Sequence, residues 1–116
     1  MARAREDVIT VLQDLASKDR HYEWYVKTGG LGNIAQELFR YWIRDAYTPH
    51  KREFQSQLTQ AEQDKLEVFT QFFEARLPGL PIRFEALMTD VHWRGIAEYA
   101  EVLLQQFAAE EGAGEV

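Results

Sequence analysis

Hydrophobic residues between positions 33 and 47 recur at steps of three and four, the spacing of an α-helix with one buried face. Polar residues occupy the opposite side of this segment. Tyr41 and Tyr47 widen the hydrophobic stripe beyond the area that one neighbouring helix would cover. The pattern therefore predicts a helix over 33–47 that packs against at least two others and lies at the centre of the fold.

The same periodicity predicts helices on both sides of this segment. Residues 4–18 have an apolar stripe, with Asp14 among the polar positions expected to face outward. Thr59 and Glu62 have the spacing of a capping box, which predicts the start of a helix that ends at Pro78. We expect Glu62 itself to lie on the outer face of that helix.

Shorter elements are predicted around the prolines and near the end of the chain. Pro49 favours a short helix over 50–58, and a short amphipathic segment follows over 84–91. Asp90 is a candidate cap for a last helix over 93–109, and the tail 112–116 is expected to be disordered.

Residues 21–28 fit two patterns. Alternation of large and polar side chains suits a strand, while Tyr22, Tyr25 and Val26 suit one face of a helical turn. A lone strand would have no partner in an otherwise helical chain, so we favour helix or irregular structure. We therefore predict an all-α fold, with a single domain over 1–111 built as a compact, irregular bundle. It would have about four main helices and one or two short ones.

Composition and charge bear on the compartment, the chemistry and the partners of the protein, not on its fold. The chain has no cysteine, which excludes disulfides, thiolate metal sites and a cysteine nucleophile. It shows neither a signal-peptide core nor a long apolar run, so we expect a cytoplasmic protein without a membrane span. The net charge is −6, and it is uneven: residues 61–116 hold four Lys and Arg against eleven Asp and Glu. This acidic half would suit a basic partner.

A glycine-rich loop is the nearest approach to a chemical motif. Residues 30–35 fit G-x-G-x-x-A, a dinucleotide-binding pattern, but the parallel strands that this motif requires are not predicted. Gly29, Gly30, Gly32 and Asn33 remain weak candidates for an anion site, with Asn33 also expected to cap the following helix.

No catalytic, cofactor-binding or metal-ligating residue is predicted. The three histidines are far apart, and the acid pairs lie on expected outer helix faces, where nothing would shift their pKa. Neither serine has a glycine elbow. The cations of the first half have acids close by, which argues against nucleic acid as a partner.

An excess of large aromatic residues between positions 21 and 47 suits either a core with polar ring tips at the surface or a binding surface. Exposed Tyr and Trp anchor protein interfaces, and acidic residues of the last helix offer a second contact. The predicted partner-binding residues are Tyr22, Trp24, Tyr25, Glu98 and Glu101. The leading hypothesis is a small acidic interaction module without catalysis: an adaptor, a regulator, or an inhibitor of the immunity or antitoxin kind.

Two alternatives stay open. One is a dimeric helical domain or enzyme that binds a small ligand or a metal with the 29–33 loop, His21 and Glu23. The other is a structural subunit of a larger complex, in which the aromatic surface is permanently buried.

Overall fold

The protein is an all-α bundle, as predicted. The computed structural model describes residues 4–30 and 32–114, with the side chains of the last helix described as far as Phe107. The structure is 83% helical without strands in its described part, and five of its seven α-helices have seven residues or more. The α-helices are α1 (Ala4–Ala16), α2 (Lys18–Lys27), α3 (Ile34–Tyr41), α4 (Arg52–Gln57), α5 (Gln60–Arg76), α6 (Phe84–Thr89) and α7 (Val91–Gly114), and a π-helical turn η1 (Trp42–Ala46) and a 3₁₀ turn η2 (Leu77–Gly79) complete the elements.

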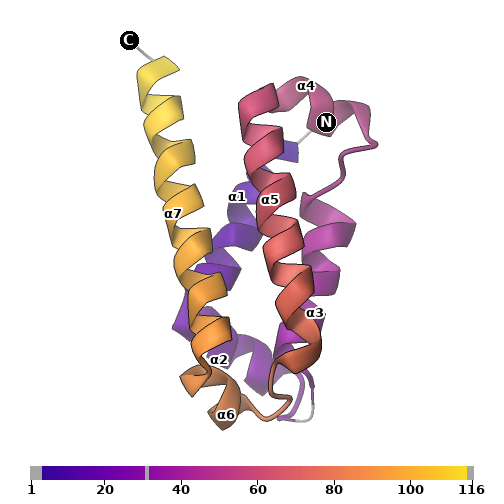
Figure 1. Ribbon diagram of the computed structural model, residues 1–116, viewed down its shortest axis with the longest axis vertical. Coiled ribbons are helices and arrows are strands. Elements are labelled where there is room, and N and C mark those ends of the chain that lie inside the picture. The colour runs from indigo at the N-terminus through magenta and orange to yellow at the C-terminus, as the bar shows by residue number, and fades with distance from the viewer. Residues whose placement is uncertain (1–3, 31, 115–116) are drawn as a thin grey trace.

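Helix α1 is the centre of the bundle. It contacts α7, η1, α2, α3 and α4, and in Figure 1 it runs behind α5 and α7. Segment 33–47 packs against α1 and α2, as predicted, and it buries Ile34, Leu38 and Trp42 as completely as α1 buries Val8 and Leu12. Helix α1 nevertheless contacts more elements than that segment does.

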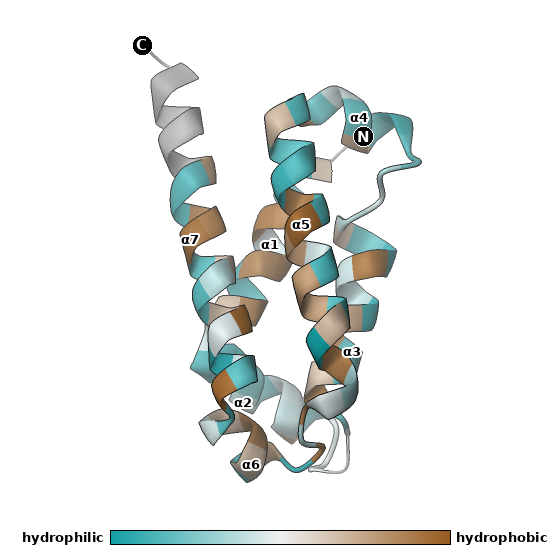
Figure 2. Ribbon diagram, viewed as in Figure 1, coloured by the Kyte–Doolittle hydropathy of each residue, from teal (hydrophilic) through white to brown (hydrophobic). Residues whose placement is uncertain are grey.

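Large, fully buried rings from η1, α4, α5 and α7 contribute to the core. The rings of Trp42 in η1 and Phe69 in α5 meet edge to face with centroids 5.3 Å apart. The indole N–H of Trp42 donates to Oγ1 of Thr70 at 2.8 Å, so this buried polar group is satisfied. In Figure 2 the hydrophobic residues of α1, α5 and α7 form bands, while α2 is mostly pale or hydrophilic in colour.

Helix boundaries follow the predicted capping residues. The Asn33 side chain accepts a bond from the Gln36 backbone N–H, and the reciprocal capping box of Thr59 and Glu62 is present. The Asp90 carboxylate accepts from the Trp93 backbone N–H at 2.9 Å. These side chains satisfy backbone donors that the first helical turn leaves without partners.

Two segments are helical, but the hydrophobic pattern of the sequence does not specify their geometry. Residues 18–27 form the helix α2, which decides between strand and helix for most of 21–28. The segment 33–47 changes from α to π geometry at Trp42, where the Tyr47 N–H donates to the Trp42 carbonyl at 2.7 Å. Helix α7 continues to Gly114. A disordered tail over 112–116 stays a prediction, and residues 115–116 lie outside the described part.

Two acidic residues expected on outer faces are buried, so those assignments are wrong. Glu62 is 1% exposed, and its carboxylate pairs with Nη1 of Arg5 at 2.7 Å. Asp14 is buried beside Arg20, whose Nη1 lies 3.6 Å from its carboxylate. In each case a cation from another helix allows burial, and the hydrophobic pattern of a single helix does not contain that information.

None of the helices in the described residues has the length and apolar character needed to cross a membrane.

Candidate functional site

Helix α2 is held to the bundle by few contacts although it carries three aromatic residues. Among its ten residues only His21 is fully buried in the part of the chain that the structure describes. Tyr22 is exposed, and Trp24 and Tyr25 are half-buried. Burial of apolar area is what normally holds a helix in place, and in α2 it comes from His21 with the half-buried Trp24 and Tyr25, while Tyr22 stays open to solvent.

One side of α2 forms a surface with α6, which we call the α2–α6 surface and define by Tyr22, Tyr25, Val26 and Phe84. The rings of Tyr25 and Phe84 stack with centroids 4.5 Å apart, and Tyr22 approaches Phe84 edge to face at 6.1 Å. Tyr22 is 56% exposed and Val26 is 57% exposed. The stacked pair thus supports two large side chains that remain open to solvent.

The other side of α2 borders a crevice of about 410 Å³ between α1, α2 and the α3–η1 segment, which we call the α2 crevice. The rings of Trp24 and Tyr41 contact each other in its lining, tilted by 42° with centroids 5.8 Å apart. The crevice is lined by Asp14, Arg20, Glu23, Trp24, Lys27, Tyr41 and Arg44. Three cations, two carboxylates and two rings therefore meet at one place.

Burial and ion pairing set the charge states in the α2 crevice. Burial raises the pKa of Asp14, an effect that the nearby Arg20 guanidinium partly offsets. Burial also raises the pKa of Tyr41, and Asp14 adds to this rise. Hydrogen bonds to the Asp45 carboxylate raise the pKa of Arg44, so this guanidinium stays charged. Arg44 is therefore charged, and Asp14, the more buried carboxylate of the crevice, binds a proton more readily than an exposed aspartate does.

The predicted partner-binding residues do not form one surface. Tyr22 and Tyr25 belong to the α2–α6 surface, whereas Trp24 lines the α2 crevice on the other side of the helix. Glu98 and Glu101 lie on α7, where they line a separate groove. Sequence proximity had suggested a single aromatic cluster, but a helix separates neighbouring residues by about 100° each.

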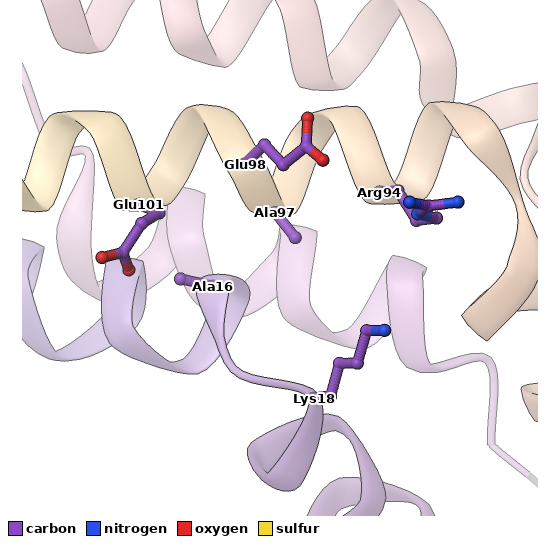
Figure 3. Close-up of a pocket in the computed structure, with 6 residues that line it drawn as sticks. All are labelled: Ala16, Lys18, Arg94, Ala97, Glu98 and Glu101. Carbon is purple, nitrogen blue, oxygen red and sulfur yellow. The ribbon is translucent and has the colours of Figure 1, made fainter.

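Glu98 and Glu101 line a groove of about 320 Å³ where the end of α1 and the start of α2 meet α7. Figure 3 shows Ala97 over the groove and Glu101 directed toward α1, while Glu98 points away from it. Lys18 and Arg94 line the same groove. Two cations therefore line the same groove as the two carboxylates.

Gly29 and Gly30 satisfy backbone carbonyls at the C-terminal end of α2. The Gly30 N–H donates to the Tyr25 carbonyl at 2.9 Å and the Gly29 N–H donates to the Val26 carbonyl at 3.0 Å. Both glycines have positive φ, 68° and 77° for Gly29 and Gly30. This is a Schellman motif, which satisfies carbonyls at a helix C-terminus. An anion at these two amides would have to replace those bonds, and it would lie at the negative end of the helix dipole.

His21 is part of the core, and Glu23 is on the surface. The His21 Nε2 lies 2.8 Å from the Leu15 carbonyl, which requires Nε2 to carry the proton. Burial lowers the His21 pKa. Its Nδ1 has no hydrogen-bond partner among the described residues, and its ring lies 5.0 Å from that of Trp93. The described residues contain no group of three or more His, Asp or Glu side chains arranged to hold a metal.

Sequence reasoning missed the α2 crevice. It treated the cations of the first half as dispersed and each balanced by a neighbouring acid, while the fold brings Arg20, Lys27 and Arg44 together. The sequence contains a weak signal, because Lys27 and Arg44 each lie in a segment that is rich in aromatic residues. Their meeting depends on how α3 packs beside α2, which local sequence does not encode.

Comparisons with protein-family models, with curated proteins and with solved structures find no match to this chain. A functional assignment therefore depends on the geometry of the surfaces described above.

Proposed function

We propose that this protein is an interaction module that binds another protein through the α2–α6 surface. The observation that carries the proposal is that α2 buries only His21 among its described residues yet presents Tyr22 and Val26, each more than half exposed, beside the Tyr25–Phe84 stack. Large side chains in such positions anchor protein interfaces, because a partner removes their apolar area from water without reordering the backbone.

The partner is expected to bring apolar side chains to this surface. We place the main contact here and not at Glu98 and Glu101, because Lys18 and Arg94 line the same groove as those two carboxylates. A basic partner would gain little from that groove, while an apolar one gains area at Tyr22 and Val26. The function is therefore adaptor-like or inhibitory binding, with hydrophobic contacts supplying the affinity.

The test compares two valine positions of equal exposure. Val26 is 57% exposed on α2 and Val68 is 55% exposed on α5. We expect Val26→Asp to weaken capture of the partner from lysate of the source cell by about tenfold or more, because a charge would be desolvated in the interface. Val68→Asp adds the same charge outside the α2–α6 surface and should retain the partner.

Folding and charge are controlled separately in this experiment. Circular dichroism and thermal unfolding of both variants show whether each one folds, and Tyr22→Ser removes aromatic area without adding charge. Tyr22→Ser should also lose the partner. Equal capture by wild type, Val26→Asp and Tyr22→Ser, or no stoichiometric partner at all, would overturn the proposal.

A further inference from the structure

The α2 crevice concentrates chemistry that the protein–protein contact does not use. Its three cations and two rings come from α2 and the α3–η1 segment, and α1 contributes Asp14. Its volume of about 410 Å³ is within the range of small-molecule pockets. We propose that the α2 crevice binds a small organic anion that carries a planar ring, through a carboxylate or phosphate held by the cations.

The cations of the crevice are the groups that can hold an anion. Arg20, Lys27 and Arg44 line the crevice with the carboxylates of Asp14 and Glu23, and Asp45 pairs with Arg44 beside them. Each arginine is more exposed than the carboxylate it pairs with: Arg20 is 53% and Asp14 10% exposed, and Arg44 is 73% and Asp45 40% exposed. Both guanidinium groups are therefore open to an anion from solvent.

The cations keep donors for a ligand after their internal pairing. Arg44 donates through Nε and Nη2 to the Asp45 carboxylate at 3.1 and 2.9 Å. Arg20 approaches Asp14 through Nη1 at 3.6 Å. Because a guanidinium has five N–H donors, each arginine retains donors of the geometry that matches a carboxylate or phosphate.

The two rings position the cations and offer a surface for the planar part of the ligand. Nζ of Lys27 lies 5.5 Å from the ring centroid of Trp24, and the Arg44 guanidinium lies 5.9 Å from that of Tyr41. Cation–π attraction at these distances limits the freedom of both side chains before binding, which lowers the entropic cost of holding an anion.

The backbone beneath Arg44 places its side chain at the crevice. Arg44 lies in the π-helical turn η1 at the end of the α3 segment, whose Tyr47 N–H reaches back five residues to the Trp42 carbonyl. Such turns occur at helix C-termini, and this one holds Arg44 beside Tyr41. This proposal does not depend on the protein–protein contact, because that surface lies on the other side of α2.

Calorimetric titration of the full chain tests the site with defined probes. Adenosine 5′-monophosphate and benzoate each combine a ring with an anionic group, while adenosine and benzamide are uncharged counterparts. We expect at least one of the anions to bind with a Kd of about 1 mM or tighter and its neutral counterpart to bind about tenfold more weakly.

Two arginines of the same segment provide a matched pair of variants. Arg44 lines the crevice and its side chain is 73% exposed, while the Arg40 side chain is 67% exposed and is not among the lining residues. Arg44→Gln should weaken binding of the charged probe about tenfold, and Arg40→Gln, which changes the net charge equally, should leave it within about twofold.

Fluorescence gives a second readout that reports location. Trp24 is half-buried at the crevice, whereas Trp42 and Trp93 are fully buried in the core. A ring bound in the crevice should change the emission of wild type, and Trp24→Phe should abolish that change. Failure of both anions to bind at about 1 mM, equal loss in Arg44→Gln and Arg40→Gln, or a ligand-induced change in emission that persists in Trp24→Phe would overturn the proposal.

Discussion

Arg5 and Glu62 join three helices at one end of the bundle. Nη1 of Arg5 contacts both carboxylate oxygens of Glu62 at 2.8 and 2.7 Å, and its guanidinium lies 5.2 Å from the ring centroid of Phe107. Glu62 also accepts from the Thr59 N–H in the capping box. Its burial is tolerated because each of these donors repays part of the desolvation cost of the carboxylate.

The same pair shows where reasoning from the sequence ends at the residue scale. The capping box of Thr59 and Glu62 is local, and it was predicted correctly. The burial of Glu62 depends on Arg5, which is 57 residues away in the chain. Asp14 is similar in that its burial beside Arg20 requires the turn between α1 and α2. Long-range pairing leaves no mark in the periodicity of one helix.

His21 gives a prediction for the pH dependence of stability. Its pKa is lowered in the fold from 6.5, mainly by burial. Below about pH 6.5 the unfolded chain therefore binds the proton more readily than the native protein, so the free energy of unfolding should fall as the pH decreases. Protonation would place a donor on buried Nδ1, which has no acceptor among the described residues.

The measurement is urea unfolding of wild type and His21→Gln between about pH 8 and pH 5. Gln can still donate to the Leu15 carbonyl but does not titrate. The difference in unfolding free energy should shift in favour of the variant as the pH falls. The raised pKa of Asp14 has the opposite effect on stability, because it destabilises the native protein when the carboxyl is charged and this destabilisation is relieved as the pH falls toward 3.8. Asp14 is present in both proteins, so its contribution cancels in the comparison. Parallel curves would contradict the role assigned to His21.

At the scale of elements, short-range signals predicted most helix ends. Asn33, Thr59 and Asp90 cap helices as expected, and the segment before Pro49 ends at Tyr47. The π turn was not predicted, because its five residues continue the hydrophobic periodicity of the helix before them. The candidate site was predicted only in part, since pattern placed aromatics on α2 but could not assign them to its two sides.

Alanine is expected to have opposite effects on stability at Gly29, in the Schellman motif, and at Gly95, inside α7. Gly29 has φ of 68°, whereas Gly95 lies inside α7, where an added Cβ meets nothing within 4 Å. We expect Gly29→Ala to reduce the free energy of unfolding by about 1 kcal/mol, because an L-residue is strained in the left-handed region. Gly95→Ala should increase it by about 0.5–1 kcal/mol. Chemical denaturation of both variants tests this, and equal signs would contradict it.

At the scale of the whole molecule, stability is expected to be unevenly distributed. Helix α1 packs against five other elements, while α2 has His21 as its fully buried residue in the described part of the chain. We expect hydrogen exchange to be slowest for the amides of α1 and markedly faster for those of α2, because opening α2 uncovers less of the core than opening α1 does. Native-state exchange followed by mass spectrometry tests this order. Equal protection of the two helices would show that α2 is anchored more firmly than its burial indicates.

The packing of α1 against α7 also bears on how the chain acquires its structure during synthesis. The two helices are close in space but lie more than 70 residues apart in sequence, from Ala16 at the end of α1 to Val91 at the start of α7. A nascent chain that has reached α5 still lacks the main cover for the hydrophobic face of α1. The core therefore closes only after α7 has left the ribosome, and until then the exposed face of α1 is a natural target for a chaperone.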